Sequence, residues 1–175
     1  MKKTRRIVIT GFMGAGKTTV ARALARLLGE GFVSLDDLVT RLEGRDPQAL
    51  LDEEGEDYFR DAETRALRLA LGEEGARVLD TGGGAWTLAR NRALVAAHDC
   101  LTVWLDAPFE LCWQRITHDA AHTARPLARD RSRAAQLYEQ RRPVYQLAAL
   151  RVRATPGRDA EGLAAEIARA AQAED

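Results

Sequence analysis

Short apolar runs alternate with longer helix-like segments along the whole chain. The runs are four or five residues long and rich in Val, Leu or Ile, as the interior strands of parallel sheets are. The segments between them have helical patterns, and Pro47 and Pro108 stand where two helices would begin. The expected strands are residues 6–10, 32–35, 77–81, 101–105 and 150–154. The expected helices are residues 18–28, 36–42, 48–54, 57–71, 88–96, 108–117, 131–141 and 160–171.

This alternation predicts an α/β fold in three layers, with a parallel sheet covered by helices on both faces. The 175 residues suit one domain, residues 1–175, without an internal repeat or an interdomain linker. The stretch from His118 to Arg131 is the exception, because it is polar, contains Pro126 and has no apolar period. It is either a surface loop or a mobile lid over a site, and we expect a lid at about residues 117–131.

A glycine-rich stretch follows the first expected strand and precedes the first expected helix. It begins at Gly11 and has the pattern G-x-x-x-x-G-K-T, ending at Thr18. Glycines let the backbone approach a polyphosphate closely, so that N–H groups and the helix N-terminus point at the anion. Lys17 would reach the outer phosphates and the Thr18 hydroxyl would hold Mg²⁺. The pattern indicates that the chain binds a nucleoside triphosphate.

Charge and composition limit the other partners. The chain has 26 basic and 26 acidic side chains, so no net charge attracts it to nucleic acid or to an anionic membrane. Cys100 and Cys112 lack the nearby partners of a zinc site and are expected to be buried in a reducing compartment. No signal-peptide core and no run of about 20 apolar residues is present. We expect a cytoplasmic monomer that acts on a small metabolite.

Three further features place polar groups at the expected site. Asp36 and Asp37 follow the second strand at the carboxyl edge of the sheet, where open α/β sheets bind ligands, although one of them could simply cap the next helix. The Thr81-Gly82-Gly83-Gly84 run follows the third strand, and its glycines suggest close approach of a ligand. Arg60 lies on a charged helix, where an ordinary solvated ion pair is the alternative to a functional role.

Six motifs, taken in order, resemble those of the shikimate kinases. The match runs from Ile7 to about Pro156 and is more specific than the glycine loop alone. The motifs are Gly-Phe-Met-Gly-Ala-Gly-Lys-Thr from Gly11, Phe-x-x-x-Asp ending at Asp36, Glu-x-x-Phe-Arg ending at Arg60, Thr-Gly-Gly-Gly from Thr81, Arg-Pro-Leu from Arg125, and Arg-x-Pro-x-Tyr from Arg141.

The resemblance implies a P-loop fold of the nucleoside monophosphate kinase type with a five-stranded parallel sheet. It also implies transfer of the γ-phosphoryl of ATP to the 3-hydroxyl of shikimate, in the route to aromatic amino acids, with Mg²⁺ as the metal. Shikimate and ATP would then be the small-molecule partners.

The resemblance also implies roles for individual residues. Asp36 would bind the shikimate hydroxyls and orient or deprotonate the attacking oxygen, while Arg60 and Arg141 would clamp the carboxylate. Backbone N–H groups of Gly82 and Gly83 would meet substrate oxygens or the γ-phosphate. Lys17 and Arg125 would join Asp36 in catalysis, with Arg125 neutralising charge from the lid. The implied ATP-binding residues are Gly14, Ala15, Gly16, Lys17, Thr18, Thr19, Arg115, Arg125 and Pro156.

One departure from the family concerns the metal. The family usually has Phe-x-Asp-x-Asp on the second strand, whereas the first of these aspartates is replaced here by Ser34. Asp80, at the end of the third strand, stands where the family generally has a small residue. We hypothesise that Asp80 supplies the missing carboxylate beside Thr18, because Mg²⁺ sites keep several waters and need few protein carboxylates. The alternative is that Asp80 is unrelated and Ser34 binds a water.

Two other functions stay open. A related small-metabolite kinase, such as a gluconate kinase, shares the loop and the size but is not expected to need Arg60, Gly82, Gly83 and Arg141 together. A nucleotide-binding regulatory protein without turnover is the second alternative, suggested by Ser34.

Overall fold

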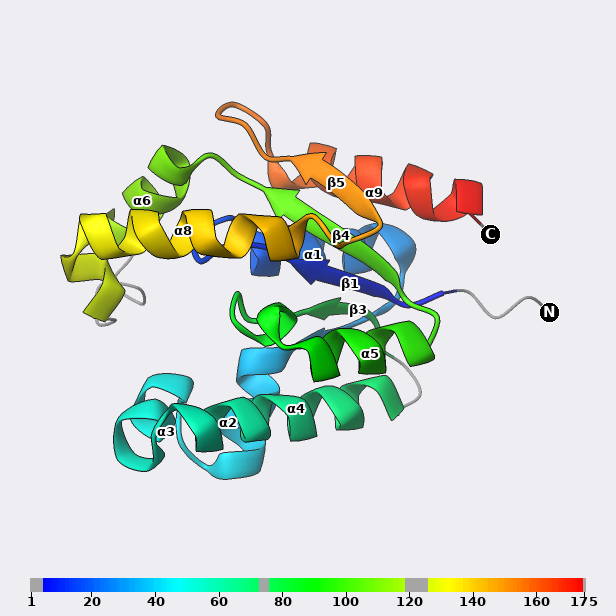
Figure 1. The fold of residues 1–175 in the computed structure, drawn as a ribbon. Helices are drawn as coiled ribbons and strands as arrows, with labels where there is room; N and C mark the ends of the chain where they lie inside the picture. Colours follow the sequence, from blue (N-terminus) through cyan, green and yellow to red (C-terminus); the bar gives the residue numbers. More distant parts are fainter. Residues whose placement is uncertain (1–4, 73–75, 119–125, 175) are drawn as a thin grey trace.

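A five-stranded sheet forms the centre of the protein (Figure 1). The computed structural model of the chain describes residues 5–72, 76–118 and 126–174. Every strand pair is parallel, and the strand order is β2-β3-β1-β4-β5. The strands are β1 (Ile7–Thr10), β2 (Gly31–Ser34), β3 (Ala76–Asp80), β4 (Leu101–Asp106) and β5 (Leu150–Arg153).

Helices connect the strands and cover both faces of the sheet. In Figure 1, α1 and α9 lie on one face, and α4, α5 and α8 lie on the other. The α-helices are α1 (Lys17–Leu28), α2 (Leu35–Glu43), α3 (Pro47–Glu54), α4 (Glu56–Gly72), α5 (Ala89–Ala97), α6 (Phe109–His118), α8 (Arg131–Tyr145) and α9 (Ala160–Glu174). Two 3₁₀ turns, η1 (Ala85–Thr87) and η2 (Pro126–Arg129), complete the described elements. The predicted three-layer α/β fold is confirmed.

The core explains why the apolar runs predict the strands so well. Ile7, Val8 and Ile9 of the central strand are completely buried, because the neighbouring strands and the helices on both faces cover them. The apolar face of α1 packs against α9, which joins the end of the chain to the helix that follows the glycine loop. Cys100 and Cys112 are both buried, as expected.

Two local expectations differ from the structure. Neither Asp36 nor Asp37 caps α2, because Ser34 occupies the N-cap and its side chain accepts a hydrogen bond from the Asp37 N–H. Both aspartates therefore lie in the first turn of the helix, where acidic residues are favourable.

Helix α8 was expected to end at Arg141, but it continues through Pro143 to Tyr145. A proline inside a helix forfeits one backbone hydrogen bond. The last turn is held from outside the helix, since the Trp86 indole donates to the Val144 carbonyl at 3.0 Å and the Tyr145 hydroxyl donates to the Gly83 carbonyl at 2.8 Å.

Because all five strands run the same way, the segments after β1, β2 and β3 meet at one edge of the sheet. These segments are the glycine loop, the first turn of α2 and the Gly82–Gly84 run. Among the described residues, no helix is both long and apolar enough to cross a membrane.

Candidate functional site

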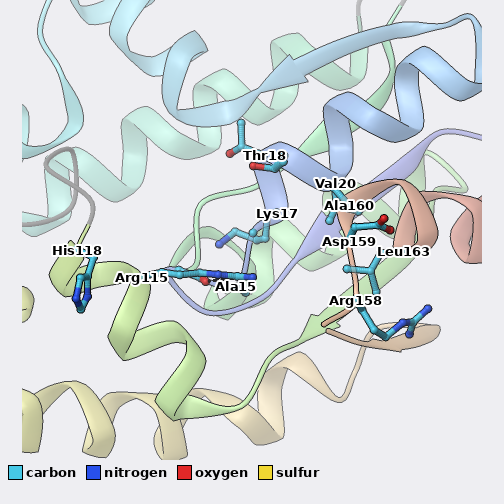
Figure 2. Close-up of a pocket in the computed structure, with 13 residues that line it drawn as sticks. Ala15, Lys17, Thr18, Val20, Arg115, His118, Arg158, Asp159, Ala160 and Leu163 are labelled. Atoms are coloured by element: carbon cyan, nitrogen blue, oxygen red, sulfur yellow. Dashed lines mark hydrogen bonds between the residues drawn. The ribbon is translucent and has the colours of Figure 1, made fainter. Parts of the chain in front are cut away.

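The glycine loop and the start of α1 form one wall of a cavity of about 680 Å³ (Figure 2). The other walls come from α6 and from the loop that leads into α9. The lining residues are Gly14, Ala15, Gly16, Lys17, Thr18, Thr19, Val20, Arg115, His118, Arg158, Asp159, Ala160 and Leu163. All six glycine-loop residues predicted to bind ATP line this cavity.

The loop needs glycine for two physical reasons. Gly14 has a φ of +78°, which strains other residues, and a Cβ there would stand 2.6 Å from the Cys112 carbonyl oxygen. Gly16, with a φ of +93°, is the N-cap of α1 and has no side chain to occupy the helix N-terminus. The first turn of α1 contains no acidic residue, so its free N–H groups face the cavity without a competing anion.

Two cations approach this loop. The Lys17 ammonium donates a hydrogen bond to the Phe12 carbonyl at 3.0 Å, which holds it over the loop. Arg115 extends from α6 across the loop beside Ala15 (Figure 2), and its Nη1 donates to the Gly14 carbonyl at 3.1 Å. The cavity therefore combines a helix N-terminus with two positive side chains, as an anion site requires.

The far end of the cavity differs from the sequence prediction. Pro156 lies on the loop between β5 and α9 but is not among the residues that line the cavity. Arg158 and Asp159, two and three residues further along, line it instead. The Asp159 side chain accepts a hydrogen bond from the Gly162 N–H at 2.8 Å at the start of α9.

A second cavity, of about 240 Å³, adjoins the first at the glycine loop, since Met13 lines one cavity and Gly14 lines the other. It gathers Asp36 from α2, Arg60 from α4, Arg141 from α8 and the three glycines after β3. The complete lining is Met13, Asp36, Pro47, Gln48, Leu51, Phe59, Arg60, Glu63, Gly82, Gly83, Gly84, Leu127, Arg133 and Arg141. All five residues predicted to bind the substrate therefore lie around one cavity.

Glu63 is a residue of this cavity that sequence reasoning missed. It is 1% exposed, and its carboxylate accepts a hydrogen bond from Arg60 Nη1 at 2.6 Å. Burial raises the pKa of Glu63 to about 7, although the nearby guanidinium of Arg60 acts to lower it. The position of the Arg60 guanidinium is therefore fixed by a buried carboxylate. The spacing of three between Arg60 and Glu63 on a helix was the available signal.

The glycine run after β3 lies against this charged pair. A Cβ at Gly84 would overlap the Arg60 guanidinium, and a Cβ at Gly82 would stand 3.0 Å from the Asp36 carboxylate. These close approaches explain why the run needs small residues where its backbone meets the side chains of Asp36 and Arg60. We find no need for a positive φ at Gly82, Gly83 or Gly84, so space and not backbone conformation selects glycine there.

Buried polar residues fix the position of the glycine run. The Asn91 amide donates to the Ala85 carbonyl at 2.9 Å, and its oxygen accepts from the Thr64 hydroxyl at 2.8 Å. Asn91 is 1% exposed, so water does not compete for these hydrogen bonds. Together with the Tyr145 bond to the Gly83 carbonyl, it ties the run to α4, α5 and α8.

Thr18, which lines the first cavity, is in contact with Asp80 at the end of β3. The Thr18 hydroxyl donates a hydrogen bond to the Asp80 carboxylate, and Asp80 is 5% exposed. Burial raises the pKa of Asp80 to about 6, while Lys17 and the Thr18 hydroxyl act to lower it. Ser34 is the Cα partner of Asp80 on the neighbouring strand.

The described residues contain no group of three or more His, Cys, Asp or Glu side chains that could hold a metal ion. A site made of one hydroxyl and one carboxylate fits Mg²⁺ nevertheless, because Mg²⁺ retains waters and takes substrate phosphates as ligands. Arg125, predicted to be catalytic, lies outside the described residues, as does the whole stretch of residues 119–125 in the expected lid. From the described part of that segment, Leu127 reaches the second cavity.

Comparison with known proteins agrees with this geometry. A family model described as shikimate kinase matches residues 13–172. The shikimate kinase of Geobacter sulfurreducens is 39% identical over 167 residues, which cover 94% of this chain and 89% of that protein. A solved shikimate kinase from Acinetobacter baumannii, in complex with shikimate, is 34% identical with a TM-score of 0.88 and covers 99% of this chain and 96% of its own.

A more distant structure shares the fold alone. The gluconokinase of Sinorhizobium meliloti is 19% identical with a TM-score of 0.64, covering 98% of this chain and 95% of its own. Sequence identity and structural similarity are therefore both higher for the shikimate kinases than for this gluconokinase, which argues against the gluconate kinase alternative. Because the family model matches nearly the whole chain and curated shikimate kinases are similar over most of its length, the chain belongs to the shikimate kinase family.

Proposed function

We propose that the protein transfers the γ-phosphoryl of ATP to the 3-hydroxyl of shikimate, giving shikimate 3-phosphate and ADP. The observation that carries this proposal is the second cavity, which brings the Asp36 carboxylate and the guanidinium groups of Arg60 and Arg141 together beside the glycine loop. The family to which the chain belongs supports the same reaction.

The two arginines suit the carboxylate of the substrate. Arg60 and Arg141 come from different helices and line the same cavity, which supports the assignment of their planar guanidinium groups to one carboxylate. Glu63 holds Arg60 in position through the 2.6 Å ion pair. Binding the carboxylate at this end would direct the ring hydroxyls towards Asp36.

Asp36 is assigned to the attacking hydroxyl. An oxygen lone pair of the 3-hydroxyl attacks the γ-phosphorus, the bond from that phosphorus to the β–γ bridging oxygen breaks, and ADP leaves. Asp36 orients the hydroxyl and accepts its proton, while Lys17 and the loop N–H groups stabilise charge on the phosphates. Gly82 and Gly83 offer backbone N–H groups to substrate oxygens or the γ-phosphate.

The ATP moiety is assigned to the larger cavity. The predicted Arg115 lines it, and Arg158 and Asp159 line its far end in place of Pro156. Arg125 remains a predicted catalytic residue on a predicted lid, at about residues 117–131. Mg²⁺, when bound with ATP, would neutralise phosphate charge and is assigned to Thr18.

The test is shikimate-dependent ADP formation with Mg-ATP, with gluconate offered in a parallel assay. We expect turnover with shikimate only, and Asp36→Asn should lower the rate by about 10²- to 10⁴-fold. Turnover with gluconate would indicate the related kinase instead. Tight ATP binding without turnover would indicate a regulatory protein.

We also propose that the protein is a cytoplasmic monomer with one domain. Among the described residues, those predicted to bind ATP or the substrate, Pro156 excepted, line cavities formed by a single copy of the chain, which supports a monomer. Sedimentation analysis at assay concentration tests the oligomeric state, since a dimer would give twice the expected mass of 19.3 kDa.

A further inference from the structure

One buried carboxylate oxygen beside the glycine loop has no hydrogen-bond partner. Asp80 is 5% exposed, and its Oδ2 accepts a hydrogen bond from the Thr18 hydroxyl. Its Oδ1 is buried and makes no hydrogen bond within the described residues. An unsatisfied buried polar atom costs about 1–3 kcal/mol, and more when it is charged. Such an atom points to a missing cationic or donor group.

The Thr18 hydroxyl is oriented to share that group. A hydroxyl has one proton and two lone pairs, so donating the proton to Asp80 leaves its oxygen free to bind a cation. Thr18 lies in the first turn of α1, next to Lys17 and the anion-binding N-terminus. In other P-loop proteins, Mg²⁺ is held by the loop Ser or Thr together with an aspartate on a neighbouring strand.

Ser34 has a different task, although it faces Asp80 across the sheet. The two residues are Cα partners on the parallel strands β2 and β3, so their Cα atoms are about 4.8 Å apart. The Ser34 oxygen accepts the Asp37 N–H at 3.4 Å as the N-cap of α2. It is neutral and contributes no charge to a divalent cation.

We propose that Asp80 and Thr18 together form the Mg²⁺ site for the nucleotide phosphates. Ser34 caps α2 instead of binding the metal, but a carboxylate at residue 34 could bind the same cation. The inference rests on the proposed function only in requiring that the protein binds ATP or ADP. It assigns the charge of the metal site to the end of β3.

The experiment measures how much Mg²⁺ strengthens ADP binding. Calorimetric titrations with ADP are run in excess Mg²⁺ and in EDTA, and the ratio of the two dissociation constants reports the coupling between metal and nucleotide. Wild type is compared with Asp80→Asn, with Ser34→Asp/Asp80→Asn, and with Asp37→Asn as the control. Asp37 is an exposed carboxylate at the same edge of the sheet.

We expect Asp80→Asn to lower the coupling ratio by about 10- to 100-fold, with ADP affinity in EDTA unchanged or tighter. Asp37→Asn should retain the wild-type ratio. The double variant should recover most of the ratio, because aspartate caps a helix as well as serine does and places a carboxylate opposite residue 80. Thermal melts of each variant check that the fold is kept.

Three results would overturn the proposal. The first is a wild-type coupling ratio of one, which would mean that Mg²⁺ does not strengthen ADP binding. The second is a coupling ratio in Asp80→Asn equal to that of wild type. The third is a fall of the coupling ratio in Asp37→Asn as large as that in Asp80→Asn. A folded double variant that recovers nothing would overturn the equivalence of residues 34 and 80. Failure of the proposed function is distinguishable, since it would appear as missing ADP binding in EDTA or missing shikimate turnover while the metal coupling is measured independently.

Discussion

Glu63→Gln tests whether burial or the ion pair with Arg60 controls the buried carboxyl of the second cavity. Burial and three charged side chains determine the protonation of Glu63. The side chains are Arg60 on the same helix, Asp36 from α2 and Arg141 from α8. Burial raises the pKa of Glu63 from its ordinary 4.5 to about 7, against the opposing effect of the two arginines.

The sign of the effect on stability follows from proton binding. Between pH 4.5 and about 7, the folded protein holds a proton on Glu63 that the unfolded chain has lost. The contribution of Glu63 to stability is therefore fully present below pH 4.5 and is lost as the pH rises towards 7. For these two pKa values, the loss between pH 5 and pH 8 is about 2–3 kcal/mol.

The assay is urea unfolding of wild type and Glu63→Gln at pH 5 and pH 8 in buffers of equal ionic strength. Groups common to both proteins cancel in the difference between their free energies of unfolding. We expect that difference to shift by about 2–3 kcal/mol in favour of the glutamine variant at pH 8. A constant difference, or a shift in favour of wild type, would show that the Arg60 pair keeps Glu63 ionised and would refute the reasoning.

Three further predictions concern the substrate cavity. The substrate carboxylate would compete with Glu63 for Arg60, so the KM for shikimate should rise as the pH increases through about 7 in wild type, but stay flat in Glu63→Gln. Arg141→Lys should raise that KM by about 10- to 100-fold with unchanged ADP affinity, because it loses the planar guanidinium; equal losses in both affinities would contradict this. Gly84→Ala should displace the Arg60 guanidinium and raise the KM by about 10-fold. Its melting temperature should change little, since Gly84 has an ordinary helical φ of −85°; an unchanged KM would contradict the steric argument.

The strands and the glycine loop could be predicted because their signals are local. The apolar runs mark β1 to β5 to within two residues at each end, and glycine spacing marks the phosphate-binding turn. Asp36 could be placed near the site from its position after β2, whereas Arg60 and Arg141 were assigned through a family resemblance, since their charges alone look like ordinary helix surface. Their meeting at one cavity depends on the parallel order of the strands.

The remaining features depend on contacts between distant segments. Glu63 belongs to a strongly charged helix start, so its burial could not be seen until the glycine run and α2 closed over it. The continuation of α8 beyond Arg141 depends on Trp86 and Gly83, which lie about 60 residues earlier in the chain. Ser34 was expected to matter only for the metal, but its extended backbone makes it the helix cap.

The pairing of Ser34 with Asp80 also constrains how sequences of this kind can diverge. If the two strand ends serve one cation, moving the charge from one to the other takes two substitutions. The path then passes through either two adjacent carboxylates, which repel each other, or none, which leaves the cation without a protein charge. The effect of a mutation at either residue therefore depends on its neighbour across the sheet. The register of the two strands therefore produces epistasis between residues 34 and 80. A mutational scan of this chain would find the carboxylate on β3 to be essential, and that result would not apply to a relative that carries the aspartate on β2.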